Sequence, residues 1–492
     1  MSTLEQLAAR ALARNASLPA IEFERHWYSW GDMRRLADRL HALIDASGAA
    51  EHAPVVLIPR NRPSAVAALI GLIAGRRTVR MLYAFQSATA IARDLQRMKP
   101  AVVVAANDDL SEEVQAVLRA QRGAGIAIED MNAAALPGLG KSCTTNCHEV
   151  ATEPQIEILT SGTTGPPKQF SLSYNLIAKH MVGLDRNRCS EASDPAQLPP
   201  ALLFFPVGNI SGIYSTLPAL LKGQRAVLLE RFSVAGWHDH VLRFRPAATG
   251  MPPAGVKMLL DANIPPEDLT SIRRLGTGAA PLDPAVHRAF EARYGIPILL
   301  TYGATEFGGP VAAMTDELHA TWGKQKFGSV GRPLPGTKLR IVDPQTSAVL
   351  PPGTEGILEV VSPRIGPHWI RTADIALIDE DGFLFHRGRA DGAIMRGGFK
   401  LLPETIERAL TLHSAVAAAA VIGIADERLG QVPAAAIEVK EGVKQPAIEE
   451  LESHLRQHVY ATHIPVAWRF VSALPRTVSF KVDGPAVRRL FE

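Results

Sequence analysis

The spacing of apolar residues alternates between two periods along the first part of the chain, to about Asp130. Segments with the helical period of apolar residues are separated by short runs of β-branched residues, which are typical of buried strands. The predicted helices are Trp30–Ile44, Arg62–Gly75 and Thr89–Met98, and the predicted strands are Val55–Ile58 and Val102–Val104. Helices that alternate with strands in this way predict an α/β layer with parallel strands.

The alternation of predicted helices and strands continues in the middle of the chain, and a different pattern follows it. Strands are predicted at Ala201–Pro206, Ala226–Leu229 and Ile298–Leu300, and the predicted helix Pro284–Tyr294 leads into the last of them. From residue 331 to residue 361, short strands alternate with Pro/Gly turns. This change of pattern predicts a small β-rich subdomain.

The last part of the chain has a pattern of its own, after a boundary predicted near Arg387–Gly392. It predicts a helix, two strands and a second helix, namely Pro403–Leu412, Ala417–Gly423, Ala434–Val439 and Glu449–Tyr460. About 100 residues are enough for an independent α+β domain. Because 492 residues are too many for one compact core, the chain is predicted to be an α/β protein of two or more domains.

Composition narrows the class of protein. With 47% hydrophobic and 21% charged residues, the chain has the composition of an ordinary globular enzyme. The formal net charge of +3 is small for this length, and no block of lysine and arginine stands out, so nucleic acid is not an expected partner. The most apolar stretches, such as Ala415–Ile424, are too short for an integral membrane segment, and the N-terminus lacks the pattern of a signal peptide.

The number and spacing of the cysteines indicate the cellular compartment. The three cysteines are too few and too unevenly spaced for a disulfide framework. Cys143, Cys147 and His148 supply only part of a metal site, because the sequence does not provide a set of four ligands. A reducing, cytoplasmic location is therefore expected.

The richest chemistry lies in Thr160–Lys168, which reads Thr-Ser-Gly-Thr-Thr-Gly-Pro-Pro-Lys. Glycines let the backbone approach a phosphate, hydroxyl and main-chain N–H groups donate hydrogen bonds, and Lys168 adds a positive charge. A triphosphate is the expected ligand, and a flexible surface loop is the alternative. Gly138–Ser142 is a poorer match to a phosphate loop, because Ala135 stands where a glycine is required and the preceding residues are predicted as helix or loop.

Four further clusters follow in the order that one active site would need. Gly276–Pro281 is a small turn-forming segment against which a flat ring can lie, and Thr301–Glu306 carries an aromatic ring and a hard oxygen ligand suited to Mg²⁺. Arg371–Asp374, followed by Gly388–Asp391, places a carboxylate that can accept ribose hydroxyls. Leu474–Lys481 ends in a lone lysine. Taken singly, each cluster is equally explained as a surface turn or a solvated side chain.

Together these clusters resemble the adenylate-forming superfamily, which includes acyl- and aryl-CoA ligases, peptide-synthetase adenylation domains and beetle luciferase. AMP-forming acyl-CoA ligases are the most similar members. The resemblance is collinear over about residues 150–485 and is strongest in Thr160–Lys168, Tyr302–Glu306, Arg371–Asp374, Gly388–Asp391 and Gly398–Glu407. It implies a large N-terminal adenylation domain over residues 1–388, a hinge at 389–391 and a small, mobile α+β C-terminal domain over 392–492.

The resemblance also implies which residues bind the nucleotide. Glu306 and Thr163 would hold Mg²⁺, and the catalytic set would comprise Lys481, Glu306, Thr163 and Lys168. The residues expected to contact ATP are Thr160, Ser161, Gly162, Thr163, Thr164, Gly165, Lys168, Gly278, Ala279, Ala280, Tyr302, Gly303, Thr305, Asp374 and Arg389.

Three residues of the C-terminal part have implied roles in the reaction. Asp391 matches the hinge, Lys481 the lysine that enters the site during adenylation, and Gly398 the glycine beside the pantetheine channel for coenzyme A. In the implied reaction a carboxylate attacks the α-phosphorus of ATP, and Mg²⁺ and Lys481 offset the growing negative charge. A thiol then attacks the acyl-adenylate and releases AMP.

Several positions depart from the pattern of that superfamily. Asn209 stands where a histidine often gates the acid pocket, and Met395 where a lysine is common. Ala373 replaces a glycine. Phe480 stands where the usual Ser-Gly-Lys has glycine, and a phenylalanine would be strained there if that position needs a positive φ.

The expected acid pocket is lined by small or neutral residues, namely Asn209, Gly212, Met251, Gly276 and Ala304. No aspartate offers itself to an amino group, which favours a fatty, alicyclic or aryl acid as the small-molecule substrate, with ATP and coenzyme A as its partners. Transfer to a carrier-protein thiol or another nucleophile, and an inactive nucleotide-binding protein, are the alternatives. A homodimer is the predicted assembly.

Overall fold

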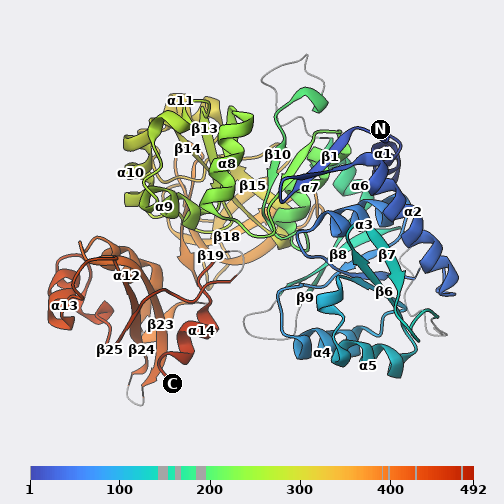
Figure 1. Cartoon of the computed structure of the whole chain (residues 1–492). Coiled ribbons are helices and arrows are strands. Elements are labelled where there is room, and N and C mark those ends of the chain that lie inside the picture. Colours follow the sequence, from blue (N-terminus) through green and yellow to red (C-terminus); the bar gives the residue numbers. More distant parts are fainter. Residues whose placement is uncertain are drawn as a thin grey trace.

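The structure is a computed structural model of the whole chain (Figure 1). The part that it describes comprises residues 2–51, 53–141, 153–160, 168–183, 195–390, 392–396, 399–426, 429–477 and 480–492. Five sheets are present in this part, and each gathers strands from one stretch of the chain or from two.

A seven-stranded sheet forms the first layer and has the order β7-β6-β5-β3-β4-β8-β9. Its strands are β3 (Val55–Ile58), β4 (Val79–Met81), β5 (Val102–Ala105), β6 (Ala124–Glu129), β7 (Asn132–Ala135), β8 (Gln155–Thr160) and β9 (Lys168–Ser173). The central strands are parallel, and β7 and β9 are antiparallel edges. Every residue of β3 and β5 is buried, as expected for parallel strands covered on both faces.

Helices cover both faces of this sheet. They are α2 (Trp30–Ala46), α3 (Pro63–Ala74), α4 (Ala88–Met98) and α5 (Glu112–Gln121). Ser29 caps α2 by accepting a hydrogen bond from the N–H of Asp32, and Pro63 opens α3, so the sequence marks both helix starts. The predicted helices and strands of this layer are confirmed within a few residues at each end.

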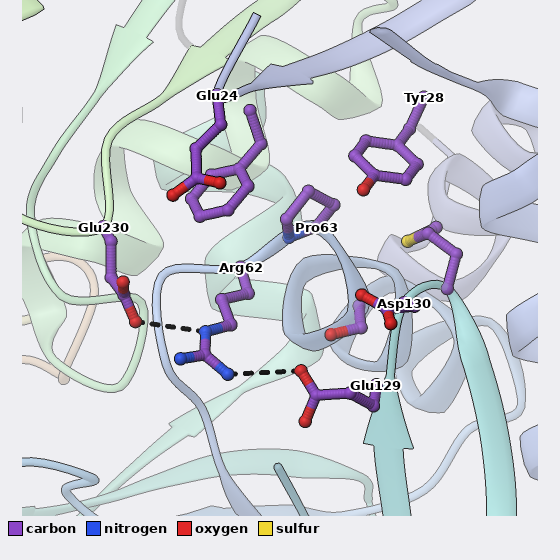
Figure 2. Close-up of a pocket in the computed structure, with 10 residues that line it drawn as sticks. Glu24, Tyr28, Arg62, Pro63, Glu129, Asp130 and Glu230 are labelled. Carbon is purple, nitrogen blue, oxygen red and sulfur yellow. Dashed lines mark hydrogen bonds and ion pairs between the residues drawn. The ribbon is translucent and has the colours of Figure 1, made fainter. Parts of the chain in front are cut away.

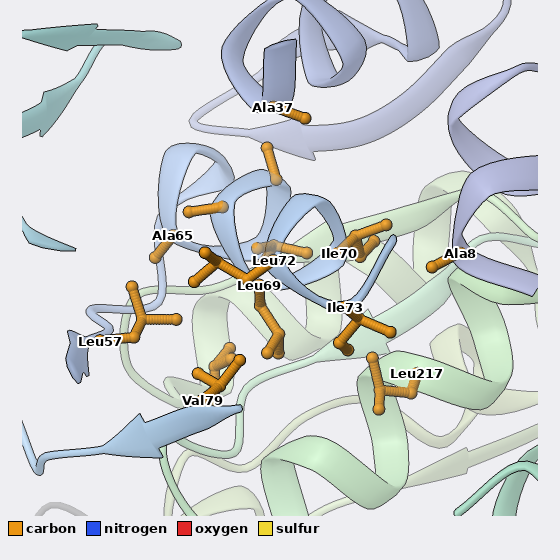
Figure 3. Packing of buried hydrophobic residues seen from close by; sticks show 14 of the residues in the cluster. Ala8, Ala37, Leu57, Ala65, Leu69, Ile70, Leu72, Ile73, Val79 and Leu217 are labelled. Carbon is orange, nitrogen blue, oxygen red and sulfur yellow. The ribbon is translucent and has the colours of Figure 1, made fainter. Parts of the chain in front are cut away.

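Helix α3 is the centre of the largest hydrophobic core (Figure 3). Its residues Leu69 and Ile73 are fully buried among side chains from other elements, including Leu57 of β3, Ala37 of α2 and Leu217. A helix that is apolar on all sides must be covered on all sides. Helix α3 therefore joins the seven-stranded sheet to the next layer.

That next layer is a four-stranded sheet of order β10-β11-β1-β2. Its strands are β1 (Pro19–Phe23), β2 (His26–Ser29), β10 (Ala201–Leu203) and β11 (Ala226–Leu228). The helices α1 (Leu4–Leu12), α6 (Tyr174–Ile177) and α7 (Ile210–Leu221) contribute to the same core. The strand predicted at Ala201–Pro206 ends at Leu203, and the following residues lead to the start of α7.

A five-stranded sheet of order β12-β13-β14-β15-β16 carries several predicted site residues. Its strands are β12 (Ala248–Gly250), β13 (Arg274–Gly278), β14 (Ile298–Ala304), β15 (Gly309–Ala313) and β16 (Arg332–Pro333). The nearby helices are α8 (Val234–Phe244), α9 (Pro253–Asp261), α10 (Pro284–Tyr294) and α11 (Asp316–Trp322). Strands β12 to β14 are parallel, so their carboxyl ends lie at one edge of the sheet.

The β-rich subdomain predicted after residue 331 is an antiparallel sheet in chain order. Its strands are β17 (Lys338–Val342), β18 (Gly356–Val361), β19 (Ile370–Ile378) and β20 (Leu384–Arg389). Consecutive antiparallel strands, separated by connections that contain Pro and Gly, are what the spacing predicts. Strand β20 leads directly to the predicted hinge.

The C-terminal part has its own sheet and its own core, seen at the lower left of Figure 1. Its strands are β21 (Ile394–Arg396), β22 (Phe399–Leu401), β23 (Val416–Asp426), β24 (Gly430–Val439) and β25 (Ala467–Val471), and its helices are α12 (Pro403–Thr411), α13 (Ile448–Arg456) and α14 (Gly484–Arg489). The α+β pattern predicted for this part is confirmed. The helix predicted to reach Tyr460 ends at Arg456.

One local prediction is wrong. The residues before Gly138–Ser142 form strand β7 rather than a helix or loop. Three of the four residues of β7 are alanine, which has low strand propensity, and pairing with β6 overrides that preference.

In the described part of the chain, no helix is long and apolar enough to cross a membrane.

Candidate active site

Two parallel strands deliver the predicted adenine turn and the predicted magnesium ligand to one edge of the five-stranded sheet. Gly278, at the end of β13, pairs with Thr301 of β14. A Cβ at Gly278 would lie 2.3 Å from the Thr301 hydroxyl oxygen and 2.8 Å from its carbonyl oxygen, so only glycine fits there. Ala279 then turns the chain with φ 68°, and Ala280 follows it. Ala279 is exposed, so this turn has a side that faces solvent.

Tyr302 and Asp374 are brought into direct contact from different sheets. The Tyr302 hydroxyl of β14 donates a short hydrogen bond to Oδ2 of Asp374 on β19. Burial, and then the negative charge of Asp374, raise the pKa of Tyr302, so the phenol stays protonated and acts as a donor. The tyrosine ring lies 5.9 Å from the ring of His386, between centroids.

The Asp374 carboxylate is held in its ionised form. Burial alone would raise its pKa, but hydrogen bonds with His386 and Tyr302 and the positive charges of His386 and Arg389 outweigh burial and lower it. Nε2 of His386 lies 3.5 Å from Oδ1 of Asp374, and Nη1 of Arg389 lies 3.3 Å from the same atom. An ionised carboxylate with oriented neighbours is suited to accept ribose hydroxyls.

The geometry of β19 and β20 explains how Arg389 reaches Asp374. The two residues are directly opposite each other in this antiparallel pair, where cross-strand side chains meet. His386, two pairs away, was not predicted from the sequence. Its signal was weak, because a single histidine in a strand indicates nothing until the partner strand is known.

Glu404 of α12 lies in the segment Gly398–Glu407 but was assigned no role from the sequence, and it contacts the chain at the predicted hinge. The main-chain N–H of Arg389 donates to Oε1 of Glu404 at 3.2 Å. A Cβ at Gly388, which has φ 145°, would lie 2.6 Å from the other carboxylate oxygen of Glu404. Glycine at this position therefore lets the first helix of the C-terminal part approach the backbone of β20.

Lys481 comes from the other end of the chain and lies beside the same charged groups. Burial lowers its pKa, the charge of Arg389 lowers it further, and the charges of Glu306 and Asp374 oppose this effect. The lysine still has exposed surface. The structure thus brings Lys481, Glu306, Asp374 and Arg389 within electrostatic reach of one another.

Glu306 is the described residue best suited to a magnesium ion. It lies in the short 3₁₀ turn Thr305–Phe307 after β14, and its side chain is exposed. Among the described residues no three metal-ligating side chains form a group. Mg²⁺ commonly binds one or two carboxylates together with substrate phosphates, so a single exposed carboxylate beside Lys481 fits this mode. Thr163, the other predicted ligand, lies outside the described residues.

Strands β8 and β9 bring the two ends of the predicted phosphate loop together. Thr160 pairs with Lys168 across this antiparallel hairpin. The loop residues Ser161, Gly162, Thr163, Thr164 and Gly165 lie outside the described part, as do the side chains of Thr160 and Lys168. Further along β9, Leu172 packs beside Gly308, the residue that follows the turn bearing Glu306.

The predicted acid-pocket residues have defined structural surroundings. Oδ1 of Asn209 accepts a hydrogen bond from the N–H of Gly212 at 2.8 Å, so Asn209 caps α7 where a histidine was expected. A Cβ at Gly212 would lie 2.0 Å from the carbonyl oxygen of Pro206. Met251 is 1% exposed, and its N–H donates to the carbonyl oxygen of Gly276. Its side chain belongs to an aromatic core cluster.

Gly303 and Ala304 complete the end of β14. A Cβ at Gly303 would lie 2.5 Å from the backbone of β15, so glycine is required for this close pairing. Ala304 precedes the 3₁₀ turn, in which Thr305 is the first residue.

Of the C-terminal residues, Asp391 and Gly398 lie outside the described part, as does the side chain of Met395.

A cavity with a volume of about 210 Å³ lies elsewhere among the described residues (Figure 2). Arg62 lies in it with its guanidinium paired to Glu230 at 3.1 Å and to Glu129 at 3.2 Å. Tyr28 and Asp130 line the cavity as well. None of the predicted site residues borders this cavity. The chemistry is therefore assigned to the edge of the five-stranded sheet.

Several solved structures share this fold over nearly their whole length. ATP-bound MatB from Rhodopseudomonas palustris superposes with a TM-score of 0.82 at 21% identity, covering 100% of this chain and 99% of that one. The o-succinylbenzoate CoA synthetase MenE from Bacillus subtilis, in complex with its acyl-adenylate intermediate OSB-AMP, superposes with a TM-score of 0.76 at 21% identity, covering 97% and 96%. The predicted architecture, a large N-terminal and a small C-terminal domain, is confirmed.

The sequence comparisons lead from this class to the family. The model of the AMP-binding enzyme family matches residues 8–367, and that of the AMP-binding enzyme C-terminal domain matches residues 405–481. The chain belongs to the AMP-binding enzyme family, within the adenylate-forming superfamily. It is thereby an AMP-forming acid–thiol ligase, an enzyme class that uses ATP, with Mg²⁺ typical of the family.

Curated relatives include ligases for several acids. The 2-succinylbenzoate–CoA ligase of Geobacillus sp. is 30% identical over 412 residues, which cover 79% of this chain and 78% of the relative. The sulfoacetate–CoA ligase of Cupriavidus necator is 30% identical over 348 residues, covering 67% and 66%. The indoleacetate–CoA ligase of Aromatoleum aromaticum is 28% identical over 499 residues, covering 96% and 94%.

Proposed function

We propose that this ligase joins a fatty, alicyclic or aryl carboxylic acid to coenzyme A by way of an acyl-adenylate. The observation that carries the proposal is the convergence of Lys481, Glu306, Asp374 and Arg389, which come from three separate parts of the chain. Such a set holds a nucleotide by its sugar and offsets charge at its phosphates. The cytoplasmic location and the homodimer stay predictions.

In the proposed first step, a carboxylate oxygen of the acid attacks the α-phosphorus of ATP. A new O–P bond forms, the bond to the bridging oxygen breaks, and pyrophosphate leaves. Lys481 would stabilise the charge that grows on the phosphate oxygens, and Glu306 would hold Mg²⁺, which shields the departing pyrophosphate when bound. Asp374 and Arg389 would hold the ribose, with Tyr302 fixed in place by Asp374.

In the second step, the sulfur of coenzyme A attacks the acyl carbon of the adenylate. A C–S bond forms, the C–O bond to AMP breaks, and the thiol proton leaves to solvent. Lys481 has no role in this step. Met251, Gly276 and Ala304 would line the acid pocket, and none of these residues is charged, which favours an apolar acid over a charged one.

Two assays test the proposal. The enzyme is first screened by exchange of labelled pyrophosphate into ATP with fatty, aryl and alicyclic acids, and for any active acid AMP release is then measured with and without coenzyme A. We expect exchange with at least one acid and AMP release that depends on coenzyme A. Exchange without this dependence would indicate another acceptor, and absence of exchange with every acid would contradict adenylation.

The lowered pKa of Lys481 predicts an alkaline limit on adenylation. The ammonium is charged below its pKa, so the rate of adenylation should fall as pH rises through a value below that of an ordinary lysine. Arginine stays charged over this range. In Lys481→Arg, the pH profile of pyrophosphate exchange should therefore lose this alkaline decline, whatever its absolute rate. An identical decline in both proteins would assign it to another group.

Gly278→Ala should weaken both the fold and nucleotide binding. The added Cβ would collide with the Thr301 backbone, and overpacking of this kind costs about 1–3 kcal/mol. Thermal unfolding and ATP binding by calorimetry measure the two effects. Gly484→Ala is the matched control, because its Cβ would meet nothing within 4 Å. Equal melting temperatures for the two variants would show that the turn accepts a side chain.

A further inference from the structure

Phe480, the residue before Lys481, has an unusual backbone conformation. Its φ of 60° is in the left-handed region, which residues with a Cβ avoid. Hydrogen bonds join residues 476–477 to residues 480–482, and these two segments are called the Lys481 hairpin. Val478 and Ser479 lie outside the described residues. The N–H of Phe480 donates to the carbonyl oxygen of Thr477, and the N–H of Thr477 donates to that of Lys481, both at 2.8 Å. The hairpin therefore fixes the direction in which Lys481 leaves the backbone.

Nη1 of Arg476 closes the same hairpin by donating to the carbonyl oxygen of Phe480 at 3.2 Å, and Arg476 pairs with Val482 in an isolated β-bridge. These bonds hold the turn from within the C-terminal domain. They do not by themselves determine how far the turn reaches toward the N-terminal domain. The Phe480 ring makes a further contact, which is with the N-terminal domain.

The Phe480 ring packs on an aromatic cluster of the N-terminal domain. It meets the ring of Phe232 edge-on, with 5.8 Å between centroids and an interplanar angle of 88°. Phe232 in turn packs against Phe204, at 5.3 Å and 68°. Phe232 is 5% exposed, and a Cβ at Gly255 would lie 2.7 Å from its ring. The Phe480 ring thus contacts a closely packed surface.

We propose that Phe480 is a positioning residue for adenylation, whose ring anchors the Lys481 hairpin on Phe232 and so sets how far the ammonium reaches toward Glu306 and Asp374. The proposal rests on the proposed function of Lys481. One side chain performs two opposed tasks here. Its Cβ makes the backbone conformation unfavourable, while its ring holds the hairpin against the opposite domain. Edge-to-face aromatic packing supplies the directional contact that offsets the backbone strain.

The backbone strain and the ring contact predict opposite changes in the rate of adenylation for the same substitution. Phe480→Gly relieves the backbone strain, so a hairpin held by its backbone alone should work as well with glycine or better. If the ring is the anchor, Phe480→Gly should slow adenylation by about tenfold, in line with loss of an aromatic pair and its packing. Phe480→Tyr keeps the ring and should stay close to wild type.

The experiment compares the half-reactions in Phe480→Gly, Phe480→Tyr, Phe232→Leu and the double variant. We expect slower pyrophosphate exchange at saturating ATP and acid, an unchanged KM for ATP, and unchanged thioester formation from supplied acyl-adenylate. The double variant should be no slower than the slower single variant, because both remove one contact. Equal loss in both half-reactions, or exchange in Phe480→Gly as fast as in wild type, would overturn the proposal.

Phe491→Leu serves as the matched control. Phe491 packs against a cluster within the C-terminal domain that includes Leu474 and Val487. Loss of a ring there should lower the melting temperature without changing the ratio of the two half-reaction rates. A change of that ratio as large as in Phe480→Gly would show that the effect comes from general weakening of the C-terminal domain, and would overturn the proposal.

A second measurement is independent of catalysis. With 4-fluorophenylalanine incorporated at position 480, we expect the ¹⁹F resonance to lie away from that of the unfolded chain and to move in Phe232→Leu. A resonance at the unfolded value that ignores Phe232→Leu would overturn the docking, even in a fully active enzyme. Conversely, a docked ring in a protein that shows no exchange with any acid would leave the contact standing while the proposed function fails.

Discussion

Lys481→Ala is expected to slow formation of the acyl-adenylate by about 10²–10³-fold, the usual effect of removing one group that stabilises transition-state charge. The ammonium lies within electrostatic reach of Glu306 and Asp374, where charge on the phosphates would grow. The variant should still convert supplied acyl-adenylate and coenzyme A to the thioester. The measurement is pyrophosphate exchange in parallel with single-turnover thioester formation.

Lys440→Ala is the control for this prediction, because it removes an exposed lysine of the same domain. It should leave both half-reactions unchanged. Comparable losses in the two half-reactions of Lys481→Ala would contradict the assigned role. They would indicate that the lysine supports the C-terminal domain as a whole rather than the adenylation step.

Much of the fold follows from local patterns in the sequence. Buried parallel strands such as Val102–Ala105 are continuous apolar runs, and helix α2 begins at a serine cap, so both are visible without tertiary information. Element ends are less visible. The helix predicted to run to Tyr460 ends at Arg456, and β7 forms from alanines because β6 offers it an edge to pair with. Tertiary pairing decides such cases, and propensity alone does not.

The candidate site was predictable where its chemistry is local. Tyr302, Glu306, Asp374 and Arg389 each lie in short motifs, and the structure brings them together with Lys481. A role for His386 could not be predicted from the sequence, because it depends on the proximity of His386 to Asp374 on the neighbouring strand. The contact of Glu404 with Arg389 and the packing of Phe480 on Phe232 could not be predicted either, because both depend on how the two domains meet.

Phe480 shows how a departure from a motif can be informative. The sequence indicated strain only if the position requires a positive φ, and the structure has φ 60° there. What the sequence could not indicate was the compensating contact, since Phe232 is about 250 residues away. A local rule broken at a site of function calls for a partner elsewhere in the fold.

Asp374→Ala should raise the KM for ATP by about 10–100-fold, because a hydrogen bond to a charged group contributes about 1.5–3 kcal/mol and the ribose would lose its ionised acceptor. The variant also leaves the Tyr302 hydroxyl and the Arg389 guanidinium without their common partner. Steady-state kinetics with varied ATP at saturating acid measure the effect, and ATP binding by calorimetry should weaken by a similar factor.

Two further variants separate the carboxylate from its surroundings. Tyr302→Phe removes one hydrogen bond but keeps the charge of Asp374, so it should raise the KM for ATP less than Asp374→Ala does. Asp379→Ala removes a carboxylate just beyond the same strand, which pairs with Lys326 at 2.9 Å, and should lower the melting temperature with little change in KM. If Asp374→Ala behaves like Asp379→Ala, then Asp374 holds β19 and β20 together and does not bind the nucleotide.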